Sequence, residues 1–232
     1  MLDSLQAYPA YKDRDVPWLG TIPNHWEVFR GRSVFEINKR IAGKLGYPVF
    51  SVTQNGLRVR DVAGNQGQVS QDYSKYQIVK SGEFAMNSMD LLTGGVGITD
   101  HLGVTSPDYR VFAIRTESLF HARYMLHVCR LLYWNRGFYS WGQGSAQLGR
   151  WRLPRKRFND FPFPVPPLDE QILISRYIDS INKQTFRFTR NRGRLIEVLN
   201  EQKQAIINRA VTRGLDPNAP LKSSGIEWLG NV

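Results

Sequence analysis

Alternation of apolar and polar positions dominates the first half of the chain. Short segments rich in β-branched and aromatic residues favour strands, and the Gly, Asn and Asp residues between them favour turns. The pattern predicts strands at 47–53, 57–62, 76–80, 83–88, 96–100 and 109–115. Apolar residues then recur at helical spacing over 118–134, with Ser118 as the expected N-cap. This part of the chain is therefore expected to mix α and β structure.

A different pattern follows 161-FPFPVPPLDEQ-171. The prolines predict an extended lead-in, and Asp169 and Glu170 suit the first turn of a helix, where the macrodipole favours acids. From Leu168 to Arg213 the spacing of apolar residues predicts one long helix, which Gly214 and Pro217 end. We expect an α+β protein, with a mixed α/β domain over 1–167, a coiled-coil-forming helix over 168–213 and a tail over 214–232.

The long helix carries an uninterrupted heptad seam, in which residues follow one another at intervals of four and three. At 1.5 Å per residue the helix would be about 69 Å long, so its own domain alone cannot cover the seam. A second helix is expected to cover it, and the alternative is a helix that folds back over its own domain. The polar seam positions are Thr185, Arg192 and Gln202. The expected dimer contacts are Ile174, Ile178, Ile181, Phe188, Leu195, Leu199, Gln202 and Ile206.

One segment of the chain occurs twice. The stretch 12-KDRDVPWLG-20 returns as 222-KSSGIEWLG-230, at an offset of 210 residues, with an identical Trp-Leu-Gly ending. We interpret the repeating unit as a domain plus a long helix. The tail then contains the truncated start of a second unit.

Composition and charge narrow the possible partners. The 232 residues include 31 Lys+Arg and 20 Asp+Glu, a formal charge of +11, and 41% hydrophobic residues, enough for a folded core. Most of the excess lies before residue 168, with 21 basic and 13 acidic residues, and it indicates a polyanionic partner such as nucleic acid. The densest run, 150-RWRLPRKR-157, follows a Gly-rich loop and is flanked by aromatic residues; the alternative is a solvated surface run.

Candidate contacts to nucleic acid fall into two kinds. Phosphates are bound by Lys and Arg, whereas bases are read by forked groups, such as Arg on guanine and Gln or Asn on adenine. Candidate phosphate contacts are Lys39, Arg40, Lys44, Arg150, Arg152, Arg155, Lys156 and Arg157. Candidate base contacts are Asn55, Arg58, Gln143, Ser145 and Gln147, and a surface or turn role is the alternative for each one. Trp18 and Trp26 are assigned to packing.

Several function classes find no support in the sequence. The single cysteine, Cys129, excludes an intramolecular disulfide framework and a Cys-rich zinc site, and we expect it to be buried on a helix. The four histidines show no metal-ligand spacing. We find no phosphate-binding loop, dinucleotide fingerprint, methyl-transfer motif or nuclease motif. From these absent motifs we expect a non-catalytic protein without bound metal or cofactor. No apolar stretch is long enough to span a membrane and the N-terminus lacks a signal peptide, so we expect the protein in the cytoplasm.

Four motifs resemble the DNA-specificity (S) subunits of type I restriction-modification systems. The opening 16-VPWLGTIPNHWEV-28 and the boundary 161-FPFPVPPLDEQ-171 are similar to segments that flank the family's target recognition domain. The stretch 85-AMNSMDLLTGGVGITDHLGVTSPDYRVF-112 looks like the core of that domain. The helix end 195-LIEVLNEQKQAIINRAVTRGL-215 resembles the end of the family's spacer helix.

The resemblance implies a function for the whole chain. Members usually carry two recognition domains, each reading one half of a split DNA target, held apart by two antiparallel helices that dock methyltransferase subunits. Only one domain and one helix are found here, which implies a half-size subunit that homodimerises through Leu168–Arg213 and reads a symmetric split site. S-adenosylmethionine and ATP are then expected on the methyltransferase and restriction subunits. A stand-alone dimeric DNA-binding regulator and an assembly factor that does not bind DNA are the alternatives.

Overall fold

A four-stranded antiparallel sheet, in the order β4-β11-β8-β9, lies at the centre of the first part of the chain. Its strands are β4 (Phe35–Asn38), β11 (Arg110–Ile114), β8 (Phe84–Met86) and β9 (Val96–Ile98). The computed structural model describes residues 7–13, 16, 18–60, 72–145, 150–216, 218, 220–227 and 230–231. The chain divides into two units, Met1–Arg176 and Tyr177–Val232, and the sheet belongs to the first.

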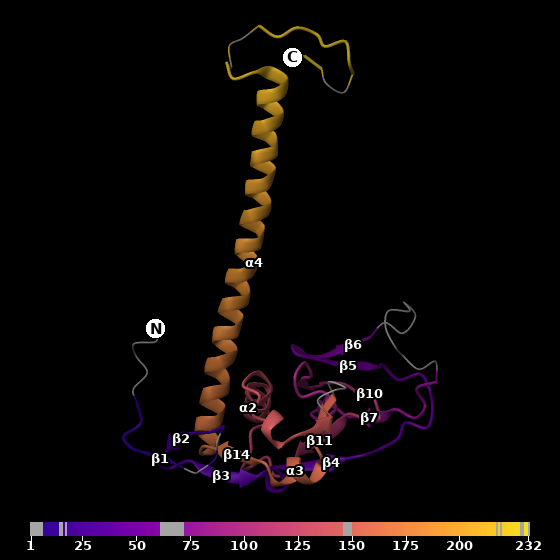
Figure 1. Cartoon of the computed structure of the whole chain (residues 1–232), viewed down its shortest axis with the longest axis vertical. Coiled ribbons are helices and arrows are strands. Elements are labelled where there is room, and N and C mark those ends of the chain that lie inside the picture. Colours follow the sequence, from indigo (N-terminus) through magenta and orange to yellow (C-terminus); the bar gives the residue numbers. More distant parts are fainter. Residues whose placement is uncertain are drawn as a thin grey trace. The chain divides into compact units, whose positions relative to one another are not determined.

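Five antiparallel strand pairs accompany this sheet in the first unit (Figure 1). They join β1 (Tyr11–Asp13) to β2 (Thr21–Pro23), β3 (Glu27–Arg30) to β14 (Pro162–Val165), β5 (Phe50–Thr53) to β6 (Gly56–Val59), β7 (Gln77–Val79) to β10 (Gly103–Thr105), and β12 (Gln143–Ser145) to β13 (Arg150–Arg152). The short helices are α1 (Gly31–Val34), the 3-10 helix η1 (Tyr139–Trp141) and α3 (Arg155–Asp160).

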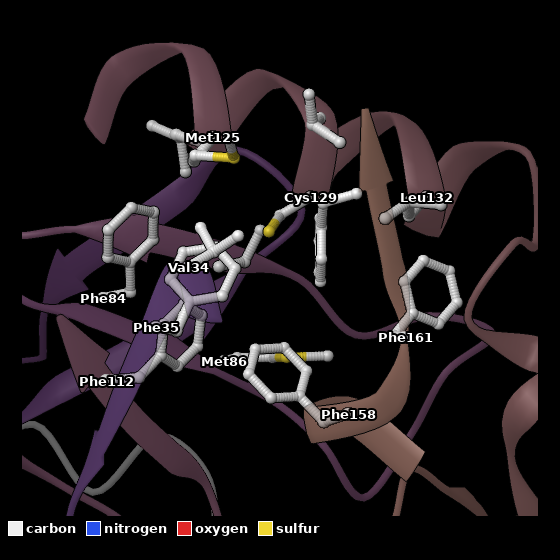
Figure 2. Close-up of a cluster of buried hydrophobic side chains, with 14 of the residues drawn as sticks. Val34, Phe35, Phe84, Met86, Phe112, Met125, Cys129, Leu132, Phe158 and Phe161 are labelled. Carbon is white, nitrogen blue, oxygen red and sulfur yellow. The ribbon is translucent and has the colours of Figure 1, made fainter. Parts of the chain in front are cut away.

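The core lies between the sheet and α2 (Ala122–Trp134). Figure 2 shows Met125, Cys129 and Leu132 of α2 above the aromatic rings that the sheet contributes. Phe84 and Phe112 stack with their centroids 4.9 Å apart. Such aromatic packing adds about 0.5–1.5 kcal/mol per pair beyond the burial of apolar area. Phenylalanine rings from strands far apart in the sequence therefore pack together in the core.

All six predicted strands have a counterpart in the structure, namely β5, β6, β7, β8, β9 and β11. Each is shorter than predicted, and β6 also begins one residue earlier, at Gly56. The strands before residue 47, β10 and the strands β12 to β14 were not predicted. The predicted N-cap Ser118 is wrong. The cap of α2 is His121, whose side chain accepts a hydrogen bond from the Tyr124 backbone N–H. Leu119, placed on the apolar face of that helix by the pattern, precedes the helix and is exposed.

The long helix is confirmed with its predicted bounds. Helix α4 runs from Leu168 to Arg213 and begins with Asp169 and Glu170 in its first turn. It continues through Gly193, and Gly214 follows its end in the left-handed region, with φ +73°. Its first residues belong to the first unit, and from Tyr177 onward it belongs to the second.

The repeated segment has the same turn in both copies. The Gly20 N–H donates to the Val16 carbonyl (3.3 Å) with φ +62° at Gly20, and the Gly230 N–H donates to the Ile226 carbonyl (3.0 Å) with φ +64° at Gly230. In the first copy Trp18 stacks on Phe161 at 5.5 Å, a packing role as predicted. In the second copy Trp228 and Leu229 lie outside the described residues. The assignment of 214–232 to the start of a second repeat stays a prediction.

Candidate DNA-binding surface

The predicted Gly-rich loop and the first residues of the basic run form a β-hairpin. Strands β12 and β13 are antiparallel, with Gln143 opposite Arg152 and Ser145 opposite Arg150. Directly opposite residues in an antiparallel pair point to the same face of the sheet. The exposed side chains of Gln143 and Arg152 are therefore neighbours on one face. Ser145 and Arg150 are placed by their backbone pairing alone, and Gln147 lies outside the described residues.

The intervening position of the hairpin faces the core. Trp151 stacks on Tyr139 at 4.9 Å, and its indole Nε1 donates to the Tyr139 carbonyl (2.6 Å). The Leu91 N–H donates to the Trp151 carbonyl at 3.1 Å. Gly142 precedes β12 and has no room for a side chain, because a Cβ there would lie 2.3 Å from Trp151 Nε1. The base of the hairpin is thus fixed while its opposite face stays exposed.

The rest of the basic run forms α3. Arg155, Lys156 and Arg157 occupy its first positions and are exposed. Phe158 is fully buried and stacks on Phe35 at 5.6 Å, which anchors this short helix to the core. With Arg152, the structure therefore presents four exposed cations on two consecutive elements.

A buried arginine beneath these elements was not predicted. Arg110 of β11 is 9% exposed; its Nη2 donates to the Leu153 carbonyl (2.7 Å), and its guanidinium lies 4.9 Å from the Phe158 ring centroid. Burial lowers the pKa of Arg110 to about 10. It contacts both the residue after β13 and the anchor of α3, so it helps to position the two elements. Nothing in the sequence separates Arg110 from the exposed basic residues or indicates that it is buried.

The remaining candidates lie on other elements. Arg40 forms an ion pair with the buried Glu83, which also accepts a hydrogen bond from Asn38 (2.9 Å), so Arg40 has a structural role whatever else it binds. Lys39 and Lys44 are exposed, and Lys44 Nζ lies 5.5 Å from the Tyr47 ring centroid.

Two candidate base contacts belong to the β5–β6 hairpin. Asn55 occupies its turn and is exposed, and its carbonyl accepts a hydrogen bond from Arg130 Nη2 (3.3 Å). Arg58 is exposed on β6. As contacts to DNA, all these candidates stay predictions.

The boundary motif is explained by two adjacent residues at the start of α4. Gln171 is fully buried; its Nε2 donates to the carbonyls of Leu119 (2.9 Å) and Pro166 (2.8 Å), and its Oε1 accepts from the His121 N–H (2.8 Å). The amide therefore joins the segment that precedes α2 and the proline lead-in to the helix start. The sequence predicted a domain boundary at this motif, and the structure shows that Gln171 supplies the hydrogen bonds that fix the backbone there.

The second residue, Glu170, joins the N-terminal segment to the same turn. Its carboxylate accepts hydrogen bonds from Tyr8 Oη, His25 Nε2 (2.8 Å) and Trp26 Nε1 (3.0 Å). Burial raises the pKa of Glu170, but these hydrogen bonds more than reverse that effect, so the pKa lies below its usual value. Burial and the bond to Glu170 raise the pKa of Tyr8 to about 12. The packing role predicted for Trp26 is thus confirmed.

The seam of α4 has two parts. Ile174 packs against the core of the first unit. Farther along, Ile181, Phe188, Leu195, Leu199 and Ile206 are between 36% and 68% exposed, and Gln202 is exposed as well. Apolar side chains repeated at heptad spacing on a helix surface are typical of a helix that packs against another helix.

Within the described ranges no three His, Cys, Asp or Glu residues are grouped so that they could hold a metal ion. Cys129 is fully buried as predicted, and burial raises the pKa of its thiol. No helix in the described part of the chain is both long and apolar enough to cross a membrane.

Comparison with known proteins places this architecture in a family. The family described as type I restriction modification DNA specificity domain matches residues 23–198. A curated protein of Methanocaldococcus jannaschii, named as the MjaX specificity subunit of a type I restriction enzyme, is 21% identical over 233 residues; the match covers 90% of this chain and 50% of that protein.

Two solved structures share the fold. A chain from a study of complex assembly and conformational transition of the type I R-M system aligns with a TM-score of 0.55 and 18% identity, over 84% of this chain and 47% of that chain. The HsdS subunit of Thermoanaerobacter tengcongensis aligns with a TM-score of 0.51 and 17% identity, over 84% and 46%. They confirm the expected α+β architecture with its long helix. The chain spans about half the length of these relatives.

The curated relative is named as a specificity subunit and the second solved structure as an HsdS subunit. More than half of the residues match the family, including the recognition domain and most of α4. The chain belongs to the type I restriction modification DNA specificity domain family.

Proposed function

We propose that this chain reads one half of a split double-stranded DNA target for a type I restriction-modification complex. The observation that carries the proposal is the outward-facing pair of Gln143 and Arg152 on the anchored hairpin, followed by the exposed cations of α3. A two-stranded β-ribbon fits the major groove, where Arg recognises guanine and Gln recognises adenine. Lys and Arg on α3 would bind the adjoining phosphates.

The DNA-binding role is tested by removing charge from the hairpin and α3. The variant Arg152→Gln/Arg155→Gln/Arg157→Gln is expected to lower the slope of log affinity against log salt by about 2, because it removes two proposed phosphate contacts that contribute about 0.9 each, together with the proposed base contact of Arg152. The variant Arg115→Gln/Arg123→Gln/Arg136→Gln removes the same charge from exposed positions of the same domain. Equal affinity and slope in both variants and the wild type would exclude this surface as the interface.

A second copy of the chain supplies the other half of the reader in this proposal. Support comes from the exposed apolar seam of α4. A closed two-fold dimer presents identical recognition domains, so its target is a symmetric pair of half-sites. Mapping of methylated sites in cells that also contain the cognate methyltransferase would test this, and two unrelated half-sites would contradict it.

The dimer itself has a direct test. Light scattering at micromolar concentration should give twice the chain mass, and Leu195→Glu/Leu199→Glu should give the mass of one chain. Leu173→Glu is the matched control, because Leu173 is exposed on the same helix outside the seam. A monomeric wild type would refute the proposal, and an unchanged mass in the double variant would move the interface elsewhere.

Methyltransferase subunits, and restriction subunits where present, are the proposed partners in the cytoplasm. They would hold S-adenosylmethionine and ATP, and this chain would direct them to the target. Co-purification with a methyltransferase is the expected result. Tight specific DNA binding without any such partner would favour a stand-alone dimeric regulator instead.

A further inference from the structure

A stripe of positive charge follows the middle of α4 on the side away from the seam. Its members are spaced by four, three and four residues and are all exposed: Lys183, Arg187, Arg190 and Arg194. At about 100° per residue they lie within an arc of about 60°, roughly 150° around the helix from the neighbouring seam positions. Pairing through the seam therefore leaves this stripe uncovered.

Acids flank the stripe only at its two ends, where Asp179 precedes Lys183 by four residues and Glu197 follows Arg194 by three. Between them the helix contains no Asp or Glu, and its one further cation, Arg192, lies 4.9 Å from the Phe188 ring centroid on the seam side. In the part of the chain that the structure describes, none of the four stripe residues forms an ion pair. The polar residues Ser180, Gln184 and Asn191 border the stripe. The surface is therefore suited to a polyanion.

The stripe works against the stability of its own helix. Lys183 and Arg187, Arg187 and Arg190, and Arg190 and Arg194 are like-charged neighbours at i,i+3 or i,i+4, an arrangement that destabilises a helix. Gly193, which lies in open space, lowers helix propensity in the same stretch. A bound polyanion would remove the repulsion without displacing any packed side chain.

We propose that this stripe binds backbone phosphates of the DNA between the two half-sites, independently of base sequence. The proposal rests on the proposed function and extends it from the recognition domain to the helix. Successive cations are about 4.5–6 Å apart along the helix axis and cover about 17 Å. Three of the four are arginines, whose planar fork matches phosphate oxygens, and neutral polar residues at the border suit further phosphate contacts. The alternative binding partner of the stripe is an acidic protein surface.

The test uses the full chain and a labelled duplex of about 30 base pairs that lacks the target site. Lys183→Gln/Arg187→Gln/Arg190→Gln/Arg194→Gln should lower the slope of log affinity against log salt by about 3 to 4 and weaken binding at about 50 mM salt by at least tenfold. Glutamine keeps helix propensity high. Arg176→Gln/Lys203→Gln/Arg209→Gln/Arg213→Gln removes the same charge elsewhere on α4 and should leave the slope nearly unchanged.

Each outcome separates this proposal from the proposed function. If the stripe variant binds like the wild type while the hairpin variant loses binding, the stripe proposal fails and the recognition domain keeps its role. If neither variant changes binding, both proposals fail. If the stripe variant keeps DNA binding but no longer co-purifies with a methyltransferase, the occupant is an acidic protein surface.

A single-site measurement covers the case in which the fourfold variant does not fold. Cys129 is fully buried, so one added cysteine can be labelled selectively with a photo-cross-linker. A label on Arg190→Cys should cross-link the non-target duplex, whereas one on Gln204→Cys, about 21 Å farther along the helix, should do so much less. Equal yields at the two positions, or none at Arg190→Cys, would overturn the proposal.

Discussion

Replacing Gln171 with alanine should strongly weaken the attachment of the first turn of α4 to the recognition domain. The buried amide makes three hydrogen bonds to backbone groups, two as donor to Leu119 and Pro166 and one as acceptor from His121. Each typical bond contributes about 0.5–1.5 kcal/mol net, so the three together contribute about 1.5–4.5 kcal/mol. Alanine also leaves these backbone groups without a partner, which favours the upper half of that range.

Thermal unfolding followed by circular dichroism measures this effect. For a domain of this size 1 kcal/mol shifts Tm by about 2–4 °C, so Gln171→Ala should lower Tm by roughly 6 to 18 °C. Gln184→Ala is the matched control, because Gln184 is exposed on the same helix and such substitutions usually change stability by less than about 0.5 kcal/mol. A Tm for Gln171→Ala within about 2 °C of the control would refute the reasoning.

Three further predictions follow from contacts described above. The pKa of Glu170 lies below its unfolded value of 4.5, so the carboxylate adds its full contribution to the free energy of unfolding above pH 4.5 and loses it as the pH falls through the folded-state pKa. Urea unfolding should therefore show that the difference in stability between the wild type and Glu170→Gln disappears in acid. The Cys129 thiol should react with Ellman's reagent only after unfolding, and rapid native-state reaction would contradict its burial. Gly142→Ala should displace Trp151 and weaken DNA binding at unchanged net charge, whereas unaltered affinity would show that hairpin position is unimportant.

Local periodicity explains what could be predicted from the sequence. The bounds of α4 were predicted because the proline lead-in, the heptad spacing and the terminal glycine are all local signals. The same kind of signal failed at Ser118, since His121 caps α2 in a turn where Gln171, fifty residues later in the chain, binds the His121 N–H. That contact exists only in the folded domain, and propensity does not report it.

The candidate site was predictable in composition but not in shape. The basic run and the flanking aromatic residues drew attention to 142–157, yet the pattern predicted a loop where a hairpin is found. The hairpin depends on Trp151 reaching Tyr139 and on Leu91 donating to the Trp151 carbonyl, which are tertiary contacts. Arg110 was missed for the same reason, because its role follows from burial next to Leu153 and Phe158.

Under the proposed function, the alternation of inward and outward positions in β12–β13 assigns base reading and domain stability to different residues. Trp151 packs inward, whereas Gln143 and Arg152 have no place in the core. Exposed substitutions away from packed groups usually change stability by less than about 0.5 kcal/mol. If these two outer positions read bases as proposed, point mutations there can change the sequence preference in successive generations while the melting temperature of the domain stays nearly constant.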